Sequence, residues 1–239
     1  MQLTISPVFF SFLFTGENVL DGQIRSAVRL LESLRCYQPP VLKNKSAVFD
    51  LNGPWRLLYS DASEITRLYK LPGRFRPDAV FQRINITGKT FENHAFLNGP
   101  AGLRASIRVV SEFDIAPKDS VNYIAKLNND EDRIEVRFLA VILSLTKFLG
   151  IPIPFIRRVV KPNRASKDED ENGIGPSLDT TYVDGNLRIG RGGDGSLFVL
   201  VKDLDDSTVP LTEETVKNLR PANKIFDASE GRVKNIRKK

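Results

Sequence analysis

The chain begins with a helical pattern and then changes to alternation. Apolar residues at positions 20, 24, 27, 28, 31 and 34 recur every three or four residues, which predicts a helix over residues 17–37. Pro39 and Pro40 end it. From Leu51 onward, short runs of alternating apolar and polar residues are separated by turn residues, a pattern typical of strands. We expect strands over residues 51–60, 79–86, 91–97, 103–115, 120–127 and 133–143.

A glycine-rich stretch from Asp179 to Val201 is the most distinctive part of the sequence. It reads as two strands of β-forming residues with a tight connection, for which Gly192, Gly193 and Gly195 supply the backbone freedom. Together with the earlier runs this makes about eight strands at short, regular spacing, which indicates an antiparallel barrel or sandwich. Helices do not alternate with the strands, so a parallel α/β sheet is not expected. Short helices are expected near residues 62–69 and 213–219.

An apolar segment between residues 136 and 161 interrupts this rhythm. Its uncharged run is shorter than the roughly 20 residues that a membrane-spanning helix needs, and prolines interrupt it. Two interpretations stay open. The segment is a loop that plugs the barrel mouth, or it is an apolar rim that dips into a lipid surface while cations meet anionic headgroups. The residues of this predicted membrane-facing loop are Phe148, Leu149, Ile151, Ile153, Phe155, Ile156, Arg157 and Arg158.

The amino-acid composition excludes several kinds of functional site. The single cysteine excludes an internal disulfide framework, and the single histidine excludes a His-rich zinc site. His94 lies in a polar stretch and is expected to face solvent. The acidic run at residues 168–171 lacks the spacing of a calcium loop and is expected to be a solvated loop, so we expect no metal and no cofactor.

Charge is concentrated at the C-terminus. Residues 217–239 hold eight basic and two acidic residues, which accounts for the whole formal net charge of +6. The body of the chain is therefore not a basic nucleic-acid-binding surface, and residues 204–239 are expected to form a basic tail. Residues 1–16 carry no charge and hold an apolar run, which favours either the remnant of a targeting segment or an extension packed on the domain.

Two motifs carry a resemblance to a known family. The first is Leu-x-Gly-x-Trp-x-Leu-x-Tyr-Ser at residues 51–60. The second is Asp-x-Thr-Tyr-x-Asp-x-x-Leu-Arg-Ile-x-Arg-Gly-x-x-Gly-x-Leu-Phe-Val-Leu at residues 179–200. In this order and spacing they resemble the plastid lipid-associated protein (PAP) family, also called fibrillins, over about residues 17–203. The chain departs from the family pattern in its short leader, its acidic run and its basic tail.

The resemblance implies a mainly β protein: an eight-stranded antiparallel, lipocalin-like barrel with an N-terminal helix. In such barrels a late arginine closes one end by stacking over the tryptophan of the first strand, a contact worth about 0.5–2 kcal/mol. Trp55 with Arg188, or secondarily Arg191, fits this role, and Asp179 and Asp184 are the candidate partners of the guanidinium. We favour this structural interpretation of the four charged residues over direct contact with a ligand.

The resemblance also implies the function. An eight-stranded barrel is wide enough for one small ligand, and we expect it to bind or coat an isoprenoid, quinone, carotenoid or acyl lipid at a thylakoid or plastoglobule surface in the plastid. The alternative is a lipocalin-like enzyme acting on such a ligand, with Asp184 and Tyr182 as acid and base. We favour a protein that is not an enzyme, and its oligomeric state stays open. The pocket predicted from strand alternation consists of Phe81, Phe91, Ile107, Val109, Phe138, Val141 and Phe198.

Overall fold

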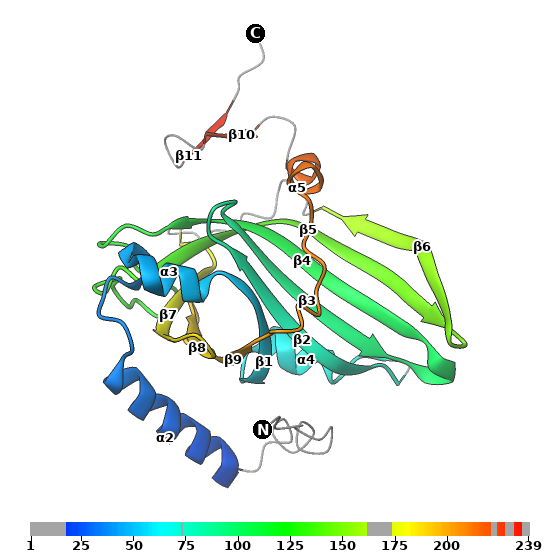
Figure 1. Ribbon diagram of the computed structural model, residues 1–239, viewed down its shortest axis with the longest axis horizontal. Coiled ribbons are helices and arrows are strands. Elements are labelled where there is room, and N and C mark those ends of the chain that lie inside the picture. Colours follow the sequence, from blue (N-terminus) through cyan, green and yellow to red (C-terminus); the bar gives the residue numbers. More distant parts are fainter. Residues whose placement is uncertain (1–17, 73, 162–173, 221–223, 228–231, 236–239) are drawn as a thin grey trace.

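The fold is described from a computed structural model (Figure 1). The description covers residues 18–72, 74–161, 174–220, 224–227 and 232–235. The predicted N-terminal extension at residues 1–16, the acidic run at 168–171 and the last four basic-tail residues lie outside it. No helix among the described residues combines the length and the apolar character needed to cross a membrane.

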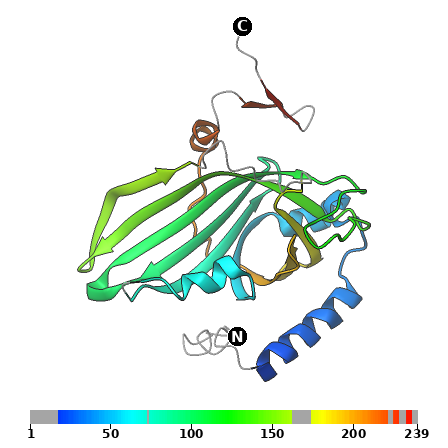
Figure 2. The same cartoon turned by 180° about the vertical axis from the view of Figure 1, so that it is seen from behind.

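Eight strands within the described residues close into an antiparallel barrel, which confirms the predicted fold class. Their order around the barrel is β4-β3-β2-β1-β9-β8-β7-β5, and pairing of β4 with β5 completes the ring seen from behind in Figure 2. The strands are β1 (Gly53–Ser60), β2 (Arg76–Asn85), β3 (Thr90–Asn98), β4 (Arg104–Ile115), β5 (Arg133–Phe148), β7 (Ser177–Val183), β8 (Leu187–Gly192) and β9 (Leu197–Lys202).

The glycine-rich stretch forms three strands, β7, β8 and β9, where the sequence predicts two. The additional turn lies at Asp184, whose carboxylate accepts hydrogen bonds of 2.7 Å from the backbone N–H groups of both Asn186 and Leu187. This side chain supplies the acceptors that a neighbouring strand would otherwise offer, so the chain turns there. The second turn uses Gly195, which has a φ of +88°.

Residues 120–127 do not form the predicted strand. They belong to a loop in which one isolated bridge joins Val121 to Leu127. The loop satisfies its backbone largely from within: the N–H of Asn128 donates to the carbonyl of Ser120 at 3.0 Å, and the N–H of Lys126 donates to the side chain of Asn122 at 2.9 Å. These local bonds replace a strand ladder.

The apolar segment that was expected to be a loop is a long hairpin. Strand β6 (Ile151–Val160) pairs with the outer half of β5 across a turn at Leu149 and Gly150, both of which have positive φ. Its prolines are tolerated because β6 is an edge strand, where a missing N–H removes no ladder bond on the open side. The hairpin from Val141 to Val160, called the wing below, projects away from the barrel (Figures 1 and 2). It does not plug the mouth.

The predicted helices are present as α2 (Asn18–Leu34), α4 (Ser63–Leu68) and α5 (Glu213–Leu219). Helix α2 packs on the barrel wall through Val28, which contacts a cluster with Tyr59, Ile189 and Leu197. A short helix that the sequence pattern did not predict, α3 (Lys45–Leu51), follows the 3-10 turn η1 (Val41–Lys43) and covers the Trp55 end of the barrel. A second 3-10 turn, η2 (Pro100–Gly102), connects β3 and β4.

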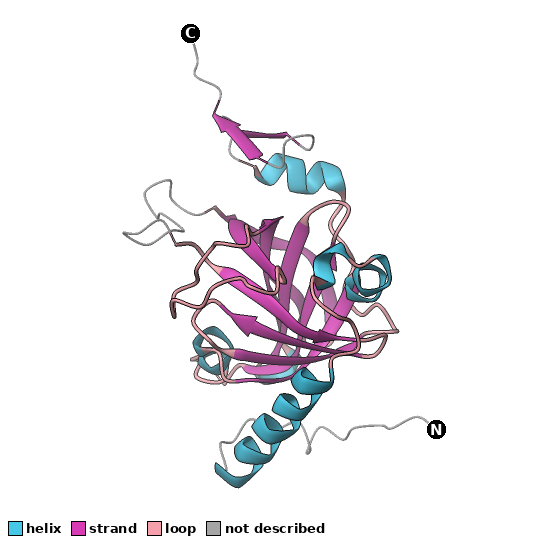
Figure 3. Cartoon of the chain, turned by 90° about the vertical axis from the view of Figure 1, so that its left-hand side faces the viewer, coloured by secondary structure: helices cyan, strands magenta, loops and turns pink. Residues whose placement is uncertain are grey.

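The segment after β9 continues along the outside of the barrel. Residues 203–212, called the strap below, carry the buried Thr208, which accepts hydrogen bonds from Arg83 of β2. Helix α5 then buries Val216 and Leu219 against the outer faces of β4 and β5. It lies on the opposite side of the barrel from α2, and the pair β10 (Lys224–Asp227) and β11 (Arg232–Asn235) follows it (Figure 3).

Candidate functional site

One end of the barrel is closed around Trp55. Its ring is fully buried, and its Nε1–H donates to the carbonyl of Leu51 at 2.8 Å. The cation over the ring is Lys202, whose Nζ lies 4.5 Å from the ring centroid and also donates to the carbonyl of Asp50 at 2.7 Å. Because Lys202 faces Trp55 directly across the β1–β9 pair, strand register explains this contact.

Arg188 is fully buried in the same end. It pairs with Leu200, which pairs in turn with Leu57, so Arg188 shares the inward row next to Trp55. None of its three guanidinium nitrogens has a hydrogen-bond partner among the described residues, and burial lowers its pKa to about 9. Stacking of Arg188 over Trp55 stays a prediction, which an unchanged Trp55 emission spectrum in Arg188→Met would contradict.

The two predicted acids have other partners. Asp179 binds Arg133 through two bonds, from Nε at 2.6 Å and from Nη2 at 3.1 Å, and also accepts from Lys126 at 3.0 Å. Burial alone would raise the pKa of Asp179, but these two cations lower it below its usual value. Asp184 caps the β7–β8 turn and accepts from the Tyr182 hydroxyl at 2.7 Å.

Arg191 points toward helix α2. Its Nε and Nη2 each donate to the Glu32 carboxylate at 3.0 Å, so it fastens the helix to β8 and does not close the barrel end. Thr181 donates to the same carboxylate at 2.7 Å. Asp179, Asp184 and Arg191 therefore each hold a different structural joint: the pair with Arg133, the β7–β8 turn and the contact with Glu32.

The other half of the barrel holds a cavity of about 450 Å³. Five of the seven predicted pocket residues line it: Phe91, Ile107, Val109, Phe138 and Phe198. Phe81 does not, because alternation turns Val80 and Gln82 inward, and Phe81 packs edge-on against Phe96 at 5.8 Å between centroids on the outer face. Val141 pairs with Val109 across β4 and β5 but lies outside the lining.

The cavity wall is mostly apolar with a few polar points. Gln82 and Asn93 face each other across β2 and β3, and Ser177 lies at the start of β7. The Gln82 Oε1 and Ser177 Oγ atoms are buried without a hydrogen-bond partner among the described residues. Buried polar atoms in proteins normally have a hydrogen-bond partner. A polar group of a ligand could supply the partner that these two atoms lack among the described residues. Tyr182 and Asp184, the predicted acid–base pair, do not line the cavity.

The cavity lining extends beyond the strands of the barrel. Helix α4 contributes Ile65 and Leu68 to the lining, and the β8–β9 turn contributes Gly193. Across the sheet, Ile107 pairs with Leu143, which pairs with Arg158, and Val109 pairs with Val141, which pairs with Val160. The inner face of the wing is therefore continuous with the cavity wall, and it carries apolar side chains and the cation Arg158.

The wing exposes large apolar side chains near its tip. Leu149 and Ile151 are 63% and 66% exposed, and Phe148 and Ile156 are also exposed. Ile153 is half-buried, and the side chain of Phe155 lies outside the description. Arg157 and Arg158 are exposed on opposite faces of β6, because Arg157 pairs with Ser144 and Arg158 with Leu143. Contiguous exposed apolar surface of this kind marks an interaction site.

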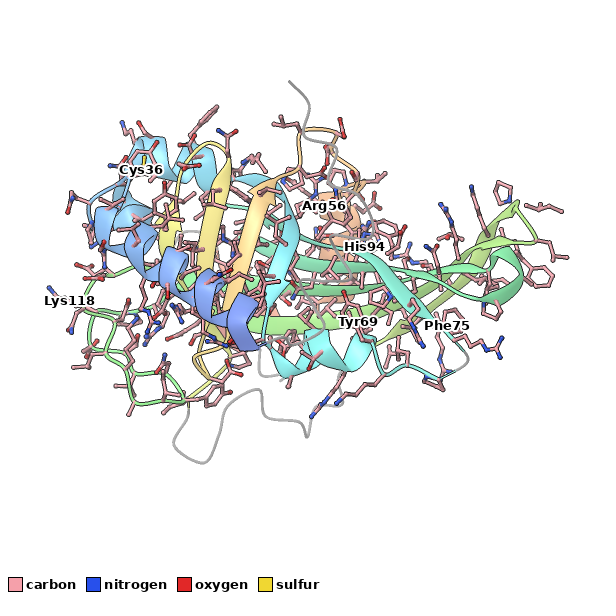
Figure 4. All side chains as sticks on the ribbon, turned by 90° about the horizontal axis from the view of Figure 1, so that it is seen from below. Cys36, Arg56, Tyr69, Phe75, His94 and Lys118 are labelled. Carbon is pink, nitrogen blue, oxygen red and sulfur yellow. The ribbon has the colours of Figure 1, made fainter. Side chains whose placement is uncertain are left out.

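His94 does not face solvent as its polar neighbours suggested. This residue, labelled in Figure 4, is 7% exposed, and its ring centroid lies 4.2 Å from that of Phe96. Burial together with the charge of Arg108 lowers its pKa to about 3. Residues of the wing and Leu211 of the strap line a cavity together with His94, and both segments are distant from it in sequence. No group of three metal-ligating side chains occurs in the part of the chain that the structure describes.

A family model described as PAP_fibrillin matches residues 15–201. The chain is 31% identical over 192 residues to "Probable plastid-lipid-associated protein 12, chloroplastic" from Arabidopsis thaliana, covering 79% of this chain and 39% of that protein. It is 29% identical over 203 residues to "Plastid lipid-associated protein 2, chloroplastic" from Brassica campestris, covering 76% and 61% respectively. The chain thus spans less than two thirds of either relative. No solved structure matches it.

Proposed function

The chain belongs to the PAP_fibrillin family, and on that premise we propose that it binds one small hydrophobic molecule inside its barrel at a plastid lipid surface. The observation that carries this proposal is the cavity of about 450 Å³, which has apolar walls and falls in the size range of small-molecule sites. An isoprenoid, quinone, carotenoid or acyl chain has the matching chemistry.

The wing supports a lipid surface as the place of binding. Its exposed leucine and isoleucine side chains would each gain about 1.5–3 kcal/mol on full burial in an apolar phase. Its inner face belongs to the same sheet as the cavity wall, through the pairs Ile107–Leu143 and Val109–Val141, so a molecule leaving the lipid phase could pass along one continuous face into the cavity. Both relatives are named chloroplastic, which supports a plastid location. Within the plastid, we propose thylakoids or plastoglobules as the lipid surface.

We propose binding and coating as the activity, without catalysis. The acid–base pair considered from the sequence, Tyr182 and Asp184, is engaged in the β7–β8 turn and lies away from the cavity lining. We assign the closed Trp55 end and the buried salt bridges to holding the barrel in shape, and the cavity in the other half of the barrel to ligand binding.

Ligand binding in the barrel is tested with a variant in which larger side chains fill the cavity. In Ile107→Phe/Val109→Phe two larger side chains enter the lumen from β4, and we expect the affinity for the uncharged polyene diphenylhexatriene to fall by about tenfold or more, or about 1.4 kcal/mol. Binding is read as energy transfer from Trp55, the single tryptophan of the chain. Val141→Phe is the matched control, since Val141 occupies the same row of the sheet but does not line the cavity. Equal affinity in the filled variant and the control would place the probe outside the lumen.

A further inference from the structure

A second cavity, of about 460 Å³, lies on the outer face of the sheet. Its floor is formed by β3, β4 and β5, and its sides by β6 of the wing and by Leu211 of the strap. The outward residues His94, Arg108 and Ile142 form one row of this floor, and Ser106, Ser144 and Arg157 form the next. Asn93 and Val109, their neighbours along the strands, face the barrel lumen instead. The two cavities therefore lie on opposite faces of the same strands, and His94 contributes to the lining of both.

His94 presents an unused hydrogen-bond donor. Its Nδ1 lies 3.1 Å from Nη2 of Arg108. Because a guanidinium can only donate, Nδ1 must accept, and the neutral ring then carries its proton on Nε2. The Nε2 atom is buried and has no partner among the described residues. A donor of this kind in a residue more than nine-tenths buried calls for an acceptor that the described residues do not supply.

Arg108 is fixed so that positive charge faces the cavity. Its Nη1 lies 3.5 Å from Glu92 Oε2 on the same face. Glu92 in turn accepts a hydrogen bond from the backbone N–H of Leu211, which ties this ion pair to the strap. Arg83, the next cation, is engaged by Asp206 and Thr208. Arg157 adds a further positive charge at the rim of the cavity. Burial lowers the pKa of Arg108, the charge of Glu92 raises it, and the nearby charge of Arg157 lowers it further.

The remaining surface of the cavity is apolar. Phe96, Ile142, Leu145, Pro152, Ile153 and Leu211 complete it. Two arginines, a histidine N–H and the Ser106 and Ser144 hydroxyls thus lie beside a surface that suits a hydrocarbon chain. This combination matches a ligand with an acceptor-rich anionic head and an apolar tail.

We propose that this outer cavity binds a single-chain anionic amphiphile, with its carboxylate or phosphate at Arg157, Arg108 and the His94 Nε2–H and its chain along the wing. Its two arginines, Arg108 and Arg157, do not line the lumen, so the site neither requires nor replaces a ligand inside the barrel. It would let the protein hold an acidic lipid at the base of the wing.

The test measures calorimetric binding of laurate, dodecyl phosphate, dodecanol and inorganic phosphate to the full chain carrying Ile107→Phe/Val109→Phe. With the lumen filled, heats report the outer cavity. Arg157→Gln is the test variant because this side chain is exposed, and Arg158→Gln is its matched control, adjacent in sequence but on the other face of β6. We expect Arg157→Gln to weaken the laurate or dodecyl phosphate complex about tenfold, and Arg158→Gln to change it by less than about twofold.

His94 gives a second variant pair. His94→Phe keeps the ring against Phe96 but removes the donor, and should weaken the same anionic amphiphile about tenfold, whereas His94→Gln retains an N–H and should recover part of the loss. The preferred head, carboxylate or phosphate, is given by the tighter of the two amphiphiles. The proposal is overturned if dodecanol binds as tightly as both, if inorganic phosphate binds as tightly, or if the Arg157 and Arg158 variants behave alike.

Discussion

Replacing Asp179 by asparagine is expected to lower the free energy of unfolding by about 3–5 kcal/mol, because it leaves a buried guanidinium without its counter-charge. Arg133 is 1% exposed and donates two hydrogen bonds to the Asp179 carboxylate. Its Nη1 also donates to the carbonyls of Ser120 and Lys126. The loss would therefore reach beyond one pair: the long loop before β5 is tied to β7 through this arginine.

Urea unfolding followed by the emission of Trp55 measures this loss, since the tryptophan is fully buried in the folded barrel. Asp205→Asn is the control, because Asp205 is an exposed strap residue, and it should change stability by no more than about 0.5 kcal/mol. A loss for Asp179→Asn as small as that of the control would mean that the Arg133–Asp179 pair does not hold the barrel together.

Low pH should remove the stability that the Arg133–Asp179 pair contributes. The pKa of Asp179 is lowered in the folded state, so its contribution is fully present above its unfolded pKa of about 3.9 and is lost as pH falls through the lower folded value. We expect the stability difference between the wild type and Asp179→Asn to be constant near neutral pH and to shrink below about pH 4. Comparing the two proteins at each pH cancels the titration of the other carboxylates.

The second large effect concerns the wing. The double variant Leu149→Glu/Ile151→Glu should lose co-flotation with vesicles of phosphatidylcholine and phosphatidylglycerol. Both side chains are more than half exposed at the hairpin tip, so the change should not disturb the core. It removes two apolar groups worth about 1.5–3 kcal/mol each on burial and adds two charges repelled by the anionic surface. The vesicle-bound fraction is expected to fall by about 100-fold or more.

Leu204→Glu/Val209→Glu provides the matched control for the wing. These strap residues are 84% and 76% exposed, so the control makes the same chemical change at an equally accessible place. It should float as the wild type does. If both variants floated alike, the wing would not be the membrane-facing element, and the sequence-based assignment of this segment would have to be given up.

The barrel was predictable because its evidence is local and repetitive. Alternation in β1 to β5 and the two family motifs indicate a mainly β domain, and five inward residues follow from alternation alone. Phe81 was misplaced by one position, which is enough to turn a side chain to the other face of a sheet. The split of the glycine-rich stretch into three strands depends on Asp184 capping a turn, a local signal that its β-forming neighbours obscured.

The partners of charged residues could not be predicted in the same way. Arg133 and Asp179 lie 46 residues apart, and Arg191 and Glu32 lie 159 apart, so only the closed barrel brings them together. The strap and the wing likewise meet His94 only in the folded chain, where they line one cavity with it. The division of the chain at residues 16 and 203 stays a prediction, although the strap and α5 pack on the barrel beyond the second boundary.

The most direct test of the central claim is mass spectrometry of the molecule that the barrel retains. The full chain is incubated with a plastid lipid extract, repurified and extracted with organic solvent, in parallel with Ile107→Phe/Val109→Phe. We expect about one apolar molecule per wild-type chain and its near-complete loss from the filled variant. Recovery of no apolar molecule from the wild type, or of equal amounts from both proteins, would contradict it.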